Sequence, residues 1–203
     1  MMKWSLLLCV AYSYGQIDSI LEKNDPKNLN MKMHQLYIDT TQRSDFYELI
    51  EKKSVSEGSS LFASVGSKKV EGNKVKLAGF SRYWVAVGKY KGLYYLYDRC
   101  DGMDGLFAVG DSMIRVYGPL EGVSWEIAKV KKNTAKEMEL ELRLGNYGHS
   151  TLSIGATQEK YIYEMKLGDD AVKVTPLDKI KNFDVIVNHC PTGKVSEYLR
   201  YLE

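Results

Sequence analysis

The residues from Val185 to Ser196 combine an apolar, strand-like run with a thiol and a glycine-containing loop. His189 and Cys190 follow the apolar run directly, and Gly193 lies three residues further on. A cysteine thiolate at the end of a strand can attack phosphorus when the N–H groups of the following loop surround the phosphate. Of all segments of the chain, this one has the residue types that nucleophilic chemistry needs.

This segment resembles the phosphate-binding loop of the cysteine-dependent protein tyrosine phosphatases, and the resemblance implies Cys190 as the nucleophile. The family has an arginine that binds the phosphate and lowers the thiol pKa, but its position is taken by Ser196. A hydroxyl cannot supply that positive charge. A nucleotide-binding loop around Gly193-Lys194 also fails, because Asn188 and Val195 replace its required Gly and Ser/Thr. We therefore expect neither activity.

Metal ligands show no typical spacing. The three histidines are far apart in the sequence: His34, His149 and His189. Asp98, Asp101 and Asp104 recur at every third position and form a weak alternative calcium site, but they do not match an EF-hand. A turn rich in Asp and Gly is the favoured interpretation. No Gly-x-Ser-x-Gly motif marks a nucleophile, so we predict no metal, no cofactor and no catalytic residue.

Tyrosine is the residue type that stands out, with fifteen in the chain. Five of them lie with one tryptophan between positions 83 and 97. An aromatic ring with a polar tip can line a ligand cavity, although tyrosine is also common in ordinary strand packing. The candidate ligand-binding residues are Tyr83, Trp84, Tyr95, Tyr97, Trp125 and Tyr163.

The elements that must position these rings are strands. From about Val75 onward, apolar and polar residues alternate, and Gly or Asx residues interrupt the pattern about every ten residues. Between positions 137 and 144, for example, Glu or Arg alternates with Met or Leu, so one face is apolar and the other is exposed to water. Residues 82–90 and 93–98 meet across Lys91-Gly92, which predicts a tight hairpin.

About ten such strands, joined by short connections, predict a mostly β protein. No predicted helix is long enough to cross between parallel strands, so we expect an antiparallel meander. It would close into a lipocalin-like barrel, with a β-sandwich as the alternative. The likeness to lipocalins is one of architecture, because Arg82 stands where their Gly-x-Trp signature would place Gly before Trp84.

The first fifteen residues have the pattern of an export signal. Lys3 precedes an apolar run at positions 6–11, and Ser13 and Gly15 are small residues suited to cleavage before Gln16. We therefore predict a signal peptide at 1–15 and a periplasmic, cell-surface or secreted protein. A β domain at 75–203 would follow a helical or irregular region at 16–74.

Two short helices are expected in the region 16–74. The first has an apolar stripe at helical spacing: Ile17, Ile20 and Leu21. The second begins at Asp45 and has the stripe Phe46, Leu49 and Ile50.

Charge and cysteine content limit the function classes. Lys and Arg total 28 against 26 Asp and Glu, without a large basic cluster, so nucleic-acid binding is not expected. No apolar run of about 18 residues follows the signal, which predicts no membrane span in the mature chain. Cys9 lies in the signal, which leaves Cys100 and Cys190 as a candidate disulfide or as two separate thiols.

These observations favour an exported binding protein for a small apolar or amphipathic molecule or a peptide. A partner-binding or structural module with a solid core is the alternative. An enzyme with a dispersed site is a third and less favoured hypothesis. A pocket of more than about 300 Å³ near the aromatic residues would favour the first hypothesis over the second.

Overall fold

The computed structural model describes eight stretches of the 203-residue chain: 21–23, 35–42, 44–52, 80–99, 105–117, 122–134, 136–144 and 148–189. Several predictions lie outside these residues and stay predictions: the signal peptide at 1–15, the Cys100–Cys190 pair, and the aspartates Asp101 and Asp104.

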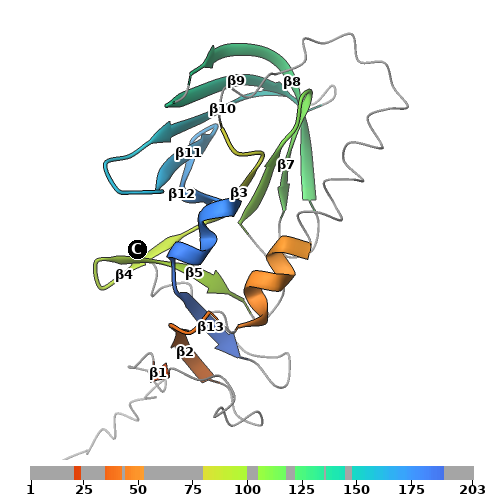
Figure 1. Ribbon diagram of the computed structural model, residues 1–203. Helices are drawn as coiled ribbons and strands as arrows, with labels where there is room; N and C mark the ends of the chain where they lie inside the picture. The colour runs from red at the N-terminus through yellow and green to blue at the C-terminus, as the bar shows by residue number, and fades with distance from the viewer. Residues whose placement is uncertain are drawn as a thin grey trace, which may run out of the picture.

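Eight strands form a closed antiparallel barrel, drawn in the upper part of Figure 1. Each strand pairs with the next around the ring, and β12 pairs with β3 to close it. The predicted antiparallel barrel is therefore confirmed, and the sandwich alternative is not what forms. The strands are β3 (Tyr83–Ala86), β6 (Leu106–Val109), β7 (Met113–Tyr117), β8 (Gly122–Asn133), β9 (Glu137–Arg143), β10 (His149–Ala156), β11 (Tyr163–Leu167) and β12 (Asp170–Pro176).

Alternation along the strands fills the barrel. In β9, Met138, Leu140 and Leu142 are fully buried, whereas the residues between them are only partly buried. They pack with Trp84 and with buried residues of β6, β7, β8, β10, β11 and β12 in one cluster, which we call the barrel core. The long strand β8 has register shifts after Ile127 and after Val130, and such bulges bend a strand. The barrel interior is thus a packed hydrophobic core.

A second sheet contains five strands in the order β1-β2-β13-β5-β4. Two pairs in it are parallel, β1 with β2 and β13 with β5, which corrects the expectation of an entirely antiparallel arrangement. The structure also places Leu21 in a strand rather than in the first predicted helix. The strands are β1 (Leu21–Lys23), β2 (Gln35–Asp39), β13 (Val185–His189), β5 (Leu93–Asp98) and β4 (Gly88–Tyr90).

The predicted hairpin at Lys91-Gly92 joins β4 and β5. Both turn residues have positive φ, 47° and 82°, as a two-residue turn of type I′ requires. However, the chain leaves the barrel just before this hairpin. β3 ends at Ala86. The N–H of Val87 still donates to the carbonyl oxygen of Lys173 in the barrel at 2.9 Å, but β4 of the second sheet begins at the next residue. The expected single strand at 82–90 is therefore two strands in two sheets.

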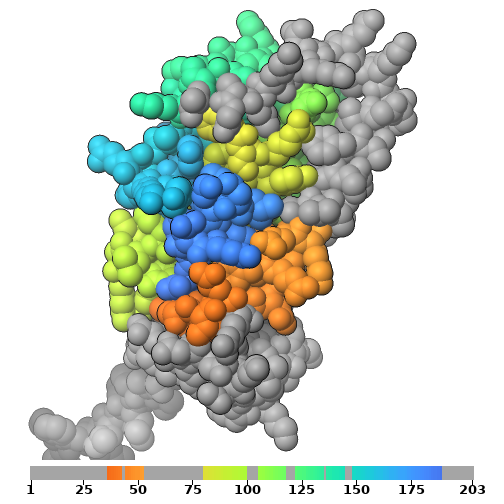
Figure 2. Space-filling view, viewed as in Figure 1, coloured from red at the N-terminus to blue at the C-terminus, as the bar shows by residue number. Residues whose placement is uncertain are grey.

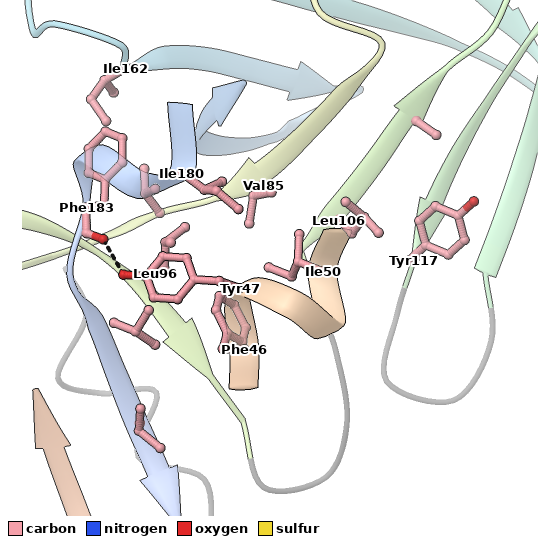
Figure 3. Close-up of a cluster of buried hydrophobic side chains, with 14 of the residues drawn as sticks. Phe46, Tyr47, Ile50, Val85, Leu96, Leu106, Tyr117, Ile162, Ile180 and Phe183 are labelled. Atoms are coloured by element: carbon pink, nitrogen blue, oxygen red, sulfur yellow. Dashed lines mark hydrogen bonds between the residues drawn. The ribbon is translucent and has the colours of Figure 1, made fainter. Parts of the chain in front are cut away.

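The second predicted helix is present and spans residues 45–52. It begins one residue after Ser44, whose Oγ accepts the N–H of Phe46 at 3.2 Å, so Ser44 rather than Asp45 is the N-cap. Phe46 and Ile50 are buried as predicted, but Leu49 is 52 % exposed and Tyr47 is buried instead. The helix packs against the barrel wall through Ile50 and Leu106 (Figure 3).

The barrel and the second sheet meet at a buried cluster that we call the junction. It includes the face of helix 45–52, and it also includes Ile180 of the 3-10 helix η2 (Leu177–Asn182). In Figure 2 the blue surface of η2 and β13 lies between the barrel strands and the orange surface of residues 36–52. The buried members are Tyr37, Phe46, Tyr47, Ile50, Val85, Val87, Leu96, Leu106, Ala108, Tyr117, Ile162, Ile180, Phe183, Val185 and Val187.

Candidate functional site

An open pocket of about 410 Å³ lies at one end of the barrel, and we call it the aromatic pocket. β11 and β3 begin at this end and β12 finishes there, before the chain continues into η2. The strand ends therefore deliver residues from three parts of the sequence to one place. The lining residues are Phe80, Ser81, Tyr83, Trp84, Tyr163, Pro176, Leu177, Asp178 and Lys179.

Four aromatic residues line the pocket, and three of their rings contact one another. The ring centroids of Trp84 and Tyr163 are 4.9 Å apart at an interplanar angle of 72°. Phe80 lies 6.0 Å from Trp84 and 6.2 Å from Tyr163 by the same measure. These edge-to-face and tilted contacts stabilise the rings in defined positions. All three rings pack with the barrel core, so the wall of the pocket is fixed by the most buried part of the molecule.

Hydrogen bonds also hold the start of β3 in place. The indole N–H of Trp84 donates to the carbonyl oxygen of Ser81 at 2.9 Å, which satisfies its only polar atom. The Ser81 hydroxyl donates to the carbonyl oxygen of Tyr83 at 2.8 Å. Trp84 is only 1 % exposed and its hydrogen-bonding capacity is already used, so it supports the pocket wall from within the barrel core.

The remaining polar groups are at the rim. Asp178 and Lys179 form an ion pair at 2.7 Å, and this contact raises the pKa of the Lys179 ammonium group. The hydroxyls of Tyr83 and Tyr163 form no hydrogen bond with another described residue. The pocket thus offers an aromatic surface, two phenol groups and one charged pair, and its lining contains no histidine or cysteine. Such a set suits binding of a flat, partly polar molecule.

Three of the six predicted ligand-binding residues meet in this pocket: Tyr83, Trp84 and Tyr163. The other three lie elsewhere. Trp125, on β8, packs against the barrel core. Tyr95 and Tyr97 are on β5 and pack in a separate cluster on one face of the second sheet. The Tyr97 hydroxyl also accepts a hydrogen bond from Asn188 Nδ2 at 3.2 Å. The chain passes from the barrel to the second sheet at Val87, so Tyr83 and Trp84 lie in one sheet and Tyr95 and Tyr97 in the other.

Residues from two segments were missed by the sequence reasoning. Phe80 comes just before β3, and the stretch 176–179 comes just after β12. Pro176 followed by Asp178 is a signal that a strand is ending, but the sequence does not show which other strand ends lie beside it.

A second pocket of about 310 Å³ lies at the other end of η2, and we call it the carboxylate pocket. Burial, with the nearby Asp39 carboxylate, raises the pKa of Asp184. A hydrogen bond with the Thr157 side chain lowers the pKa of Glu159. The lining residues are Leu93, Tyr94, Tyr95, Glu159, Lys160, Ile162, Asn182, Phe183 and Asp184.

Within the described stretches, no group of three or more His, Cys, Asp or Glu side chains is arranged to hold a metal ion. Asp98, the first of the three spaced aspartates, is the last residue of β5. His149 is an exposed residue at the start of β10. Among the same residues, no helix is long and apolar enough to cross a membrane.

Comparison with known proteins gives no relative from which a function could be transferred. The sequence matches no family model, and neither the curated proteins nor the solved structures contain a significant match.

Proposed function

We propose that this chain is an exported binding protein that holds a small amphipathic molecule in the aromatic pocket. The observation that carries the proposal is the open volume of about 410 Å³ beside Phe80, Trp84 and Tyr163. Ligand sites typically have about 300–1,000 Å³ and combine apolar walls with a few polar groups. A module with a solid core would fill this volume with the same rings.

The arrangement favours a ligand with a flat apolar body and one polar end. The body would lie against Trp84 and Tyr163, whose rings belong to the barrel core. The polar end would reach the Asp178–Lys179 pair at the rim. Because these groups are already held in place, binding would cost little additional ordering of the protein.

Export and the disulfide are part of the same proposal. β5 and β13 are parallel neighbours with Val187 opposite Asp98, so both strands run toward the same edge of the sheet. Cys100 is two residues beyond Asp98 and Cys190 is three beyond Val187. Pairing of the two thiols stays part of the proposal. The intact mass after thiol alkylation, with and without reductant, tests it, since two alkylated cysteines in the unreduced mature protein would contradict the bond.

Tryptophan fluorescence can test the binding proposal. Trp125→Phe leaves Trp84 as the one tryptophan of the proposed mature chain, because Trp4 lies in the signal. The probe is 1-anilinonaphthalene-8-sulfonate, an aromatic molecule with one anionic group. We expect saturable energy transfer from Trp84 to the bound probe.

Two further variants locate the probe. In this background, Tyr163→Ala should weaken binding at least about tenfold, which corresponds to about 1.4 kcal/mol. Tyr163→Phe keeps the ring and should bind nearly as well. Tyr90→Ala, on the hairpin outside the pocket, is the matched control. Equal affinities for Tyr163→Ala and Tyr90→Ala, or no saturable transfer, would refute the proposed site.

A further inference from the structure

The carboxylate pocket is a separate site with different chemistry. η2 separates it from the aromatic pocket, because Leu177–Lys179 line one pocket and Asn182–Asp184 line the other. Its apolar wall includes Ile162 and Phe183, which lie next to each other in Figure 3. Both side chains belong to the junction and are buried. The wall is therefore as well packed as that of the aromatic pocket.

Asp184 has a partly buried carboxylate without a counter-ion. It makes no hydrogen bond or ion pair with any residue in the described part of the chain. Its backbone is fixed, since its carbonyl oxygen accepts the N–H of Leu96 at 3.0 Å. The neighbouring charge that acts on it is the carboxylate of Asp39, which has the same sign. A carboxylate in such surroundings gains free energy when a cation approaches.

The other polar atoms of the pocket also favour a donor. The Asn182 Nδ2 group already donates to the carbonyl oxygen of Lys179 at 2.9 Å, which leaves its Oδ1 as an acceptor. Glu159 is a second carboxylate on the rim. Lys160 is the one cationic residue among the lining residues, and its ammonium group lies over the Tyr161 ring, 4.7 Å from the centroid. Among the charged side chains that line the pocket, two are carboxylates and one is an ammonium group.

We propose that the carboxylate pocket binds an organic amine in its ammonium form, with the nitrogen at Asp184 and an apolar body against Phe183 and Ile162. An ammonium group has three N–H donors and no acceptor, which complements Asp184 and the Asn182 Oδ1. A charge-assisted hydrogen bond to a carboxylate is about twice as strong as a neutral one. The proposal uses no residue of the aromatic pocket, so it stands or falls independently of the ligand proposed there.

Three probes with the same phenylethyl body test the charge requirement. They are 2-phenylethylamine, the neutral 2-phenylethanol and the anionic 3-phenylpropanoate, each added to the full ¹⁵N-labelled chain at pH 7. We expect the amine to shift the backbone amide signals of residues 182–184 and to bind at least tenfold more tightly than the alcohol. The anion should bind more weakly still. Equal affinity for amine and alcohol would overturn the proposal, and so would shifts confined to residues 80–84.

Opposite charge changes on the protein sharpen the test. Asp184→Asn should weaken amine binding about tenfold, while Lys160→Met, which removes a like charge and keeps the chain length, should strengthen it several-fold. Asp169→Asn and Lys166→Met make the same changes outside both pockets and should leave the affinity unaltered. Thermal unfolding confirms that each variant is folded. No effect of Asp184→Asn in a folded protein, or weaker amine binding by Lys160→Met, would contradict the site.

Discussion

The barrel and the second sheet differ in how far along the chain their partners lie. From β6 to β12, each barrel strand pairs with its successor, and the side chains that fill the interior alternate along those strands. The second sheet instead joins β2, from the N-terminal part of the chain, to β13, which follows the whole barrel. Apart from its closure by β12 and β3, most of the barrel is assembled from local contacts, whereas β13 of the second sheet pairs with strands far away in the sequence.

This difference also locates the pockets. The barrel interior contains fully buried side chains such as Leu140 and Ile154, so it acts as a rigid support. The two described pockets lie on either side of η2, where the chain passes from the barrel to the second sheet. In this molecule we therefore propose binding at the border between the two sheets and not in the interior of the barrel.

The largest expected effect concerns the barrel. Leu140→Ala should lower the free energy of unfolding by about 3–5 kcal/mol, because a fully buried leucine leaves a cavity in a packed core. Leu93→Ala, at a hairpin position that is 63 % exposed, should change it by less than about 0.5 kcal/mol. Urea unfolding measures both. A cost below about 1 kcal/mol for Leu140→Ala would mean that the interior has room for a ligand.

A smaller effect is expected at the junction. The buried hydroxyl of Tyr47 donates to the carbonyl oxygen of Phe183 at 2.7 Å, and burial raises its pKa, which keeps it protonated. Tyr47→Phe should cost about 1–2 kcal/mol, because the carbonyl group loses its donor. Hydrogen exchange should accelerate in β13 more than in β9. Tyr90→Phe is the control, and equal acceleration in both strands would mean that the two sheets open as one unit.

The smallest effect concerns Asp184. Because burial and Asp39 raise its pKa, its ionisation costs stability in the folded protein. The cost is absent below about pH 3.9, the pKa of an aspartate in the unfolded chain. It is complete above the raised pKa that Asp184 has in the folded protein. Asp184→Asn should therefore stabilise the protein at pH 7, by less than about 1 kcal/mol, and lose this advantage near pH 3.

Other groups near Asp184 must be considered in that measurement. Asp39 and the phenol of Tyr47 face it from β2 and helix 45–52, and Glu159 and Lys160 line the same pocket. Asp178→Asn, measured by the same pH series of thermal unfolding, controls for an exposed carboxylate. A loss of stability for Asp184→Asn at pH 7 would contradict the assigned environment.

Local patterns of the sequence were sufficient to predict the barrel. The alternation in β9 and the turn at Lys91-Gly92 are both determined by residues that are close together in the sequence. Each element can therefore be predicted from its own residues. The helix at 45–52 was predicted for the same reason, although its exposed Leu49 shows that spacing alone does not determine which side is covered.

Features that depend on distant partners were not predictable. Nothing in residues 82–90 indicates that the chain changes sheets at Val87, and this change separates Trp84 from Tyr95. β5 pairs in parallel with β13, although seven barrel strands, β6 to β12, lie between the two in the sequence. Half of the predicted aromatic set therefore lines the aromatic pocket, and residues 176–179 were found only from the structure.

The central claim is that ligands bind beside η2 and not within the barrel. Backbone amide shifts of the full ¹⁵N-labelled chain, titrated with 1-anilinonaphthalene-8-sulfonate, test it most directly. The account predicts shifts at residues 80–84, 163 and 177–179, with residues 138–142 and 152–154 unchanged. Shifts centred on residues 138–142 and 152–154 would place the probe inside the barrel and contradict the account.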